Sequence, residues 1–247
     1  MKNPFAITPT DEVTTLGRIL GVPVVVKGRT WFPLIELGTW LVMVWLGGRR
    51  RPRRSLAGRA RTAALTMPVF LGSEWSHNLA HAATARAIGR PMDALRIVWG
   101  MPLCVYYDIN DAQVTPRQHM LRALGGPIWN GFVLLISLLL RPRTRRGSVA
   151  REVADVAVGM NGFLAGASLL PLPGIDGGPL LKWGLVWRGR SIEQAEETVR
   201  RVDGVLGLGL IAGGAAAAAK RSWLVSAMLL MFGVLSLGFA TGKIREQ

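Results

Sequence analysis

The stretch Ser73–Ala82 reads SEWSHNLAHA and places His77 and His81 four residues apart inside a long apolar segment. The length of that segment predicts a helix rather than a strand or loop. Residues i and i+4 lie on one face of an α-helix, so the two imidazoles can point at a single metal ion. Buried histidines that bond only to backbone are also common. The surrounding sequence therefore has to decide between a metal site and a packing role.

Half of all residues are hydrophobic, and they are gathered in blocks rather than in amphipathic stripes. Each block has about 17–25 residues, the length needed to cross about 30 Å of hydrocarbon. We therefore predict an all-α polytopic membrane protein with about six transmembrane helices. A single bundle, residues 31–241, is expected between an N-terminal segment (1–30) and a short tail (242–247). The predicted spans are approximately 31–47, 62–88, 121–140, 153–172, 202–219 and 223–241.

Two short segments predict a small membrane-associated β element. Ile19–Val26 is rich in β-branched residues and indicates a strand. Residues 95–111 are rich in Val, Ile, Tyr and Trp and are interrupted at Gly100, which indicates a hairpin or re-entrant loop. Such a loop must pack on protein or line a wet cavity, because unpaired backbone is not tolerated facing lipid.

The 30 Lys and Arg residues outnumber the 15 Asp and Glu residues, which gives a formal net charge of +15. The densest arginine clusters, in residues 47–61 and 141–151, lie at the ends of apolar blocks. Anionic lipid headgroups would meet them there, so membrane lipids are expected partners and nucleic acid is not. The charge distribution leaves the orientation undecided. Cys104 is the sole cysteine, which excludes an intrachain disulfide, and the first 20 residues lack the features of a removable signal peptide.

Ionisable residues inside a membrane span are costly and usually mark a functional site, which strengthens the metal interpretation of His77 and His81. Asp176 lies in a Pro/Gly-rich break, residues 171–179, and could approach a neighbouring helix from unwound backbone. It could be a turn aspartate alone. Together with the histidines it would supply three protein ligands and leave the fourth zinc position for water.

Three motifs resemble the site-2 protease family of intramembrane zinc metalloproteases. HNLAH (77–81) lies where the family has H-E-x-x-H, and ALGGPIWN (123–130) resembles its G-P-x-x-N segment. SLLPLPGIDGG (168–178) looks like its N-x-x-P-x-P-x-L-D-G motif, with Ser168 and Gly174 as departures.

This resemblance implies a Zn²⁺ ion held by His77, His81 and Asp176. It also implies Asn130 and Asn161 as polar residues near the substrate or oxyanion. The expected activity is hydrolysis of a transmembrane substrate helix, as in regulated intramembrane proteolysis, in a prokaryotic cytoplasmic membrane.

Asn78 occupies the position of the family's catalytic glutamate, and an amide cannot take a proton from water at neutral pH. The base could have moved to Glu74, one turn earlier on the same helix face. Glu74 could instead be a fourth ligand that closes the site. The chain could also be an inactive pseudoprotease that binds metal and recognises membrane helices or partners without cleavage, or carry Asn78 as an engineered substitution. A transporter or scaffold is disfavoured because no inverted repeat is present.

Two further expectations concern packing. Gly209 and Gly213 form a small-xxx-small pattern that favours close helix contact in lipid. His119 precedes an apolar block and is expected to be an interfacial histidine rather than a ligand.

Overall fold

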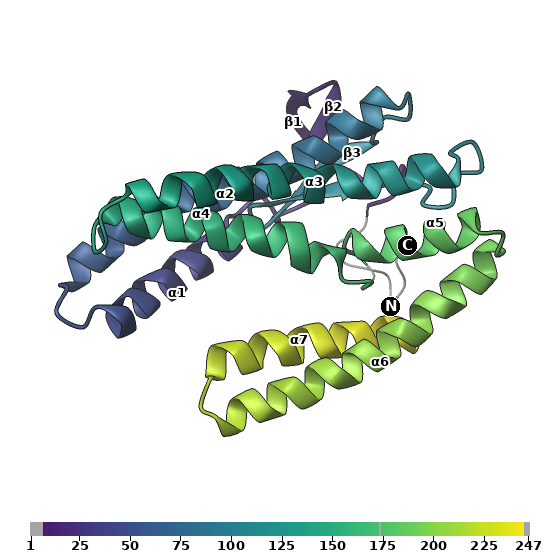
Figure 1. Ribbon diagram of the computed structural model, residues 1–247. Coiled ribbons are helices and arrows are strands. Elements are labelled where there is room, and N and C mark those ends of the chain that lie inside the picture. Colours follow the sequence, from purple (N-terminus) through teal and green to yellow (C-terminus); the bar gives the residue numbers. More distant parts are fainter. Residues whose placement is uncertain (1–6, 173, 245–247) are drawn as a thin grey trace. The chain divides into compact units, whose positions relative to one another are not determined.

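A computed structural model describes residues 7–172 and 174–244 of the protein (Figure 1). The strands and the first helices alternate along the chain, and helices alone follow. The elements are β1 (Thr14–Ile19), β2 (Val22–Val26), α1 (Leu34–Arg50), α2 (Leu56–Ala87), β3 (Ala94–Val98), β4 (Met101–Val105), α3 (Pro116–Leu140), η1 (Arg141–Arg143), α4 (Val149–Gly166), η2 (Ala167–Leu169), α5 (Gly177–Trp187), α6 (Ile192–Ala219) and α7 (Trp223–Ala240).

The described chain divides into two compact units. The sheet unit holds residues Ile7–Asp108 and Leu124–Ala167, and therefore all four strands with α1, α2, α4 and most of α3. The α5–α7 unit holds Ile109–Ala123 and the chain from Ser168 onward. The parts of the predicted N-terminal segment and tail at residues 1–6 and 245–247 lie outside the described residues.

The four strands form one sheet in the order β1-β2-β3-β4, with β2 and β3 parallel and the outer pairs antiparallel. Each outer pair is a hairpin with a two-residue loop, Leu20-Gly21 and Trp99-Gly100, and all four loop residues have positive φ. Such loops match the natural twist of paired strands. The single strand predicted at Ile19–Val26 is therefore wrong in detail, because the chain reverses at Leu20-Gly21.

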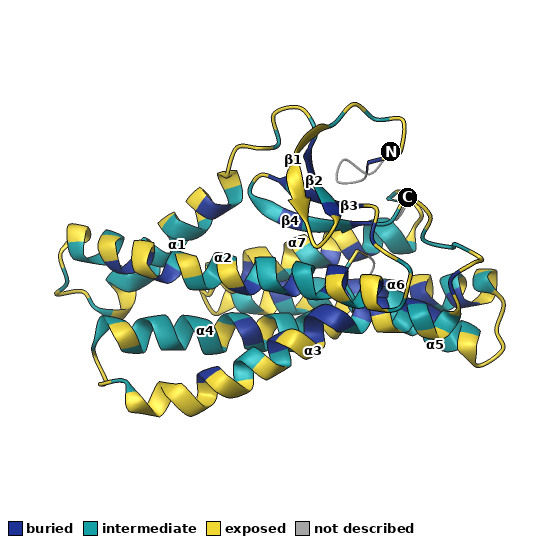
Figure 2. Cartoon of the chain, turned by 90° about the horizontal axis from the view of Figure 1, so that it is seen from above, coloured by how far each residue is buried: buried dark blue, intermediate teal, exposed yellow. Residues whose placement is uncertain are grey.

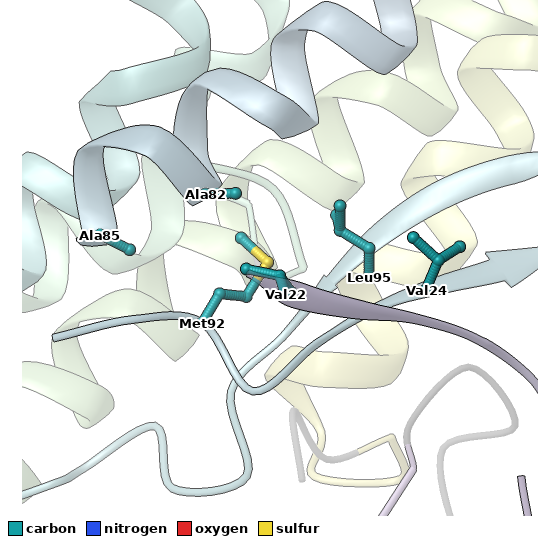
Figure 3. Packing of buried hydrophobic residues seen from close by; sticks show 6 residues of the cluster. All are labelled: Val22, Val24, Ala82, Ala85, Met92 and Leu95. Atoms are coloured by element: carbon teal, nitrogen blue, oxygen red, sulfur yellow. The ribbon is translucent and has the colours of Figure 1, made fainter. Parts of the chain in front are cut away.

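One face of the sheet packs on the C-terminal half of α2 (Figure 3). Val22, Val24 and Leu95 from the strands meet Ala82 and Ala85 from the helix, and all are nearly inaccessible to solvent. The alanines are small, so the strands can approach the helix closely. This packing fixes the part of α2 that carries the histidines.

Helices α1 and α4 both pack on α2 within the sheet unit (Figure 2). The α1–α2 turn and the start of α4 are joined by Arg54, whose guanidinium makes two hydrogen bonds to Glu152, at 2.8 and 2.9 Å. A bidentate contact of this kind fixes both distance and orientation. The two arginine-rich turns therefore lie at the same end of this unit.

In the α5–α7 unit, α6 and α7 form an antiparallel pair with closely apposed backbones (Figure 1). A Cβ atom at Gly214 would lie 2.7 Å from Leu230 Cγ, and one at Gly233 would lie 2.7 Å from Ile211 Cγ1. By contrast, nothing lies within 4 Å of a Cβ placed on Gly209, and Gly213 has only ordinary contact. The expectation for Gly209 is wrong, because that residue faces outward from the pair.

The prediction of a mostly helical membrane protein with a small β element is confirmed. Three helical segments of the described chain are long and apolar enough to cross a membrane: Pro116–Arg143, Ile192–Ala219 and Trp223–Ala240. The count of six is not confirmed. Helix α1 has only 17 residues, and α2 and α4 carry polar or charged side chains along their length. The predicted division into segment, bundle and tail stays a prediction.

We predict that Gly214→Leu destabilises the α6–α7 pair, whereas Gly209→Leu on the same helix does not. The first substitution overpacks a contact that is already tight, which typically costs about 1–3 kcal/mol. The second places its side chain in open space. Thermal unfolding in detergent measures the difference, and equal effects of the two variants would contradict the close packing at Gly214.

Candidate metal centre

The candidate site is built on one buried face of α2. Ser73, His77 and His81 follow one another at four-residue steps, and their exposed fractions are 6%, 7% and 5%. The hydroxyl of Ser73 donates to the carbonyl oxygen of Val69 at 2.8 Å, so it stays within the helix. This face carries the polar side chains of the segment toward α3 and α4.

The imidazoles of His77 and His81 meet edge to face, with ring planes at 79°. Their Nε2 atoms lie 3.0 Å apart. Both nitrogens therefore converge on one small region, as two ligands of a single ion must. The pair needs no backbone distortion, because i and i+4 side chains are neighbours on a regular helix.

His77 is oriented by a buried amide from α3. Its Nδ1 lies 2.6 Å from Oδ1 of Asn130, which is completely buried. An amide oxygen can only accept, so Nδ1 carries the hydrogen and Nε2 keeps its lone pair. A partner that fixes the tautomer of a histidine in this way is a regular feature of metal-binding imidazoles.

Asn130 is itself held by α4 and α2. Its amide nitrogen donates to Oδ1 of Asn161 at 2.6 Å, and the amide of Asn161 donates to Ser73 Oγ at 3.0 Å and to the carbonyl of Ala157 at 2.9 Å. Each residue in the series His77, Asn130, Asn161 and Ser73 therefore donates a hydrogen bond to the next one, and the series begins and ends on α2. We call these four residues the histidine-anchoring network.

His81 is placed by the backbone of α3. The N–H of Gly126 donates to His81 Nδ1 at 3.4 Å. A Cβ atom on Gly126 would lie 2.4 Å from His81 Nε2 and 2.6 Å from His77 Nε2. A side chain at this position would overlap both rings, so glycine lets α3 pass directly against the histidine pair.

With Nδ1 as acceptor, the neutral His81 ring carries its hydrogen on Nε2 and donates it to Nε2 of His77. A zinc ion bound through both Nε2 atoms would take the place of that hydrogen and require the other tautomer of His81. Two imidazoles whose nitrogens meet in this way, one of them oriented by a buried amide, fit a zinc ion.

Asn78 lies on the same helix but is engaged elsewhere. Its amide nitrogen donates to the carbonyl oxygen of Glu74 at 3.0 Å. Its side-chain oxygen accepts from Cys104 Sγ in β4, at 3.1 Å. The side chain at the position of the family's base is thus held between its own helix and the sheet.

Glu74 lies one turn before Asn78 and is half-buried. Its Oε2 atom is buried and has no hydrogen-bond partner among the described residues. Glu36 of α1 interacts with it electrostatically, and the carboxylate oxygens of Glu36 are likewise buried without a hydrogen-bond partner in the described chain. Glu74 therefore keeps one buried carboxylate oxygen without a donor among the described residues, close in sequence to the histidine pair.

Asp176 belongs to the α5–α7 unit, where it is the half-buried residue that precedes α5. The turn around it is tight, since a Cβ atom on Gly177 would lie 2.1 Å from the carbonyl oxygen of Leu170. The carbonyl oxygen of Asp176 accepts from the N–H of Leu180 at 3.1 Å, which starts the helix. Pro173, within the same predicted motif, lies outside the described residues.

His119 is buried in the α5–α7 unit, where its ring stacks on Trp183 with centroids 3.7 Å apart. It packs within the protein, and its position at the membrane interface stays a prediction. Sequence reasoning also missed three residues near the histidine pair. Ser73 could have been found from its four-residue spacing to His77, and Gly126 from its place as the glycine of the G-P-x-x-N segment, whereas Cys104 gave no distinct signal.

Comparisons with known proteins show what this chain is similar to. A protein of Methanocaldococcus jannaschii assigned by name to the zinc metalloproteases is 29% identical over 128 residues. That match covers 45% of this chain and 66% of the relative, so the chain spans slightly less than two thirds of the curated relative's length. The solved structure of a site-2 protease from the same organism is similar with a TM-score of 0.55 and 15% identity, over 91% of this chain and 95% of that one. No family model matches the chain.

The structural match shows that the chain has the fold of a site-2 protease, a helical membrane protein. The sequence match adds similarity to a protein named as a zinc metalloprotease over 45% of this chain. Zinc is the metal that the candidate ligands and the metalloprotease relative support.

We predict that Gly126→Ala strongly reduces zinc bound to the purified protein, because the added methyl group would overlap both imidazole rings and displace them. Gly131→Ala on the same helix is the matched control, since nothing lies within 4 Å of a Cβ placed there. Mass-spectrometric metal analysis measures the zinc per chain. Full zinc content in Gly126→Ala would show that the ion does not depend on the placement of the two rings against Gly126.

Proposed function

We propose that this chain is a site-2-protease-like intramembrane zinc protein whose general base is altered. The observation that carries the proposal is the histidine pair itself. Its Nε2 atoms converge at 3.0 Å in front of Gly126, and Asn130 fixes the tautomer of His77. Three buried side chains, Asn130, Asn161 and Ser73, orient the imidazole of His77 through hydrogen bonds. Such support is typical of histidines that bind a metal ion.

Asp176 is proposed as the third ligand. It lies in residues 168–178, which resemble the family's aspartate motif, and no other Asp or Glu occurs in that segment. With His77 and His81 it would complete a His₂Asp set. Three protein ligands leave one zinc position for water, which is the arrangement of catalytic rather than structural zinc.

Asn130 and Asn161 are proposed as positioning residues. The completely buried side chain of Asn130 uses its oxygen for His77 and its nitrogen for Asn161. Contact with the histidine therefore has better support than contact with a substrate or oxyanion.

Zinc, when bound, polarises a carbonyl and brings the pKa of its water to about 7. The chain must still provide a group that takes and returns the proton during peptide hydrolysis. Asn78 cannot do so, since its amide accepts no proton and is tied to Cys104 and Glu74. Glu74 is the carboxylate nearest in sequence, and its Oε2 has no hydrogen-bond donor among the described residues. We assign it as the displaced base.

The substrate expected for such a site is a transmembrane protein helix, because apolar helices of this length place the chain within a bilayer. The cytoplasmic membrane of a prokaryote remains the proposed location, with membrane lipids as surroundings.

One observation favours a second function, that of a metal-binding pseudoprotease. The hydrogen bonds of Asn78 to the helix and to Cys104 show a side chain integrated into the packing rather than aimed at a reacting group. Such a protein would keep the ion and recognise membrane helices or partners without cleavage.

The ligand set is tested by His77→Ala and Asp176→Ala. Each variant is predicted to lose stoichiometric zinc from the protein purified in mild detergent without added metal or chelator. Ser137→Ala is a suitable control, because among the described residues its hydroxyl bonds only to the carbonyl of its own helix at Val133. Zinc retained in either ligand variant would remove that residue from the set.

The variant Glu74→Gln distinguishes the protease from the pseudoprotease. If Glu74 is the base, this variant binds zinc normally but loses about 10²–10⁴-fold in cleavage of a transmembrane reporter substrate. Unchanged cleavage with Gln at this position would end the assignment. A chain that binds zinc and cleaves no member of a library of transmembrane segments, with or without Asn78→Glu, would favour the pseudoprotease.

A further inference from the structure

A cavity of about 600 Å³ opens within the sheet unit among side chains of α1, α2 and α4. Its two ends differ in chemistry. The end beside the α1–α2 turn is lined by arginines and two acids, whereas the other end is lined by apolar side chains, among them Met43, Phe70, Met160 and Phe163.

The cavity follows the helices for about three turns. Arg59 and Phe70 on α2 mark its two ends, as do Glu152 and Phe163 on α4. At about 1.5 Å per residue, each of these pairs spans about 17 Å. The cavity is therefore an elongated groove that leads from a charged mouth into an apolar interior.

The charged mouth has an excess of positive charge. Four arginines but only two acids line it. Glu152 is bound by both Arg51 and Arg54, and Asp155 is bound by Arg141 at 2.6 Å.

Two of the lining arginines have no acidic partner in the described chain. Arg50 ends α1 and is exposed. The Arg59 guanidinium donates to the carbonyl oxygens of Arg54 and Pro52, at 2.8 Å each. These two guanidinium groups are thus available to an anion at the mouth.

We propose that this groove binds one anionic phospholipid, with its phosphate at Arg50 and Arg59 and an acyl chain along the apolar floor. The volume lies within the roughly 300–1,000 Å³ of small-molecule sites. Arginine binds phosphate through paired N–H donors, and basic residues at a membrane surface attract anionic headgroups. A soluble anion would leave the apolar floor unused, and a zwitterionic lipid such as phosphatidylcholine would bring its own cation to a mouth that already has an excess of positive charge. The inference does not depend on the proposed protease function.

The groove and the histidine pair share one helix. Residues of α2 from Arg59 to Phe70 line the groove. The histidine-anchoring network begins one turn further along the same helix, at Ser73. A lipid seated there would fill the space beside α2 between side chains of α1 and α4.

The test uses the full-length protein, delipidated in mild detergent, and phosphatidylglycerol or phosphatidylcholine of equal chain length. Native mass spectrometry counts the bound lipids. We expect one phosphatidylglycerol to bind about tenfold or more tightly than phosphatidylcholine. The double variant Arg50→Gln/Arg59→Gln should remove most of that preference. Gly159→Phe should weaken binding of both lipids, because Gly159 lines the groove and has open space at its Cβ.

The matched control is Arg145→Gln/Arg146→Gln, which removes the same charge from exposed positions outside the groove. An equal loss of preference in this control would show diffuse attraction and overturn the site. Equal binding of the two lipids by the unaltered protein would do the same. Displacement of phosphatidylglycerol by inorganic phosphate at equal concentration would reassign the mouth to a free anion. Should Gly159→Phe fail to fold, the arginine variants still decide the proposal.

Discussion

The candidate site depends on one hydrogen bond, from Nδ1 of His77 to Oδ1 of Asn130. An imidazole can rotate about its side-chain bonds and exchange its hydrogen between two nitrogens, so a histidine without a partner defines neither direction nor tautomer. Asn130 removes both freedoms, because its oxygen only accepts. Asn161 in turn fixes which end of the Asn130 amide faces the histidine. Burying the two amide groups costs desolvation free energy. Their hydrogen bonds to His77, to each other and to Ser73 offset that cost.

The same constraint explains why α3 carries glycine where it passes the histidines. Helices normally pack 8–10 Å apart, with side chains filling the space between them. At Gly126 no side chain intervenes, and the two rings occupy the space instead. The packing of the alanines of α2 against the sheet holds the other side of the helix. The histidines are therefore placed by rigid backbone on one side and by an apolar core on the other.

Much of this could be predicted from the sequence, and the parts that could not have physical causes. Apolar block length predicted the helices, and four-residue spacing predicted that His77 and His81 share a face. The resemblance singled out Asn130 and Asn161, but the sequence did not reveal that they bond to each other and to Ser73, because contacts between helices depend on their rotation about their axes. The small-residue pattern misidentified Gly209 for the same reason. The Leu20-Gly21 reversal was missed since leucine rarely adopts positive φ.

Asn78 replaces the expected catalytic base without disturbing the contacts of the candidate metal ligands. Its amide bonds to Cys104 and to the carbonyl of Glu74 leave the histidine contacts untouched. Zinc binding at the histidine pair can therefore be tested separately from peptide hydrolysis. X-ray absorption at the zinc edge of the purified protein tests it most directly. Our account predicts about one zinc per chain with only nitrogen and oxygen ligands at about 2.0–2.2 Å, two of them imidazoles. A sulfur ligand at about 2.3 Å would place the ion at Cys104 instead, and it would contradict the account, as would the absence of zinc.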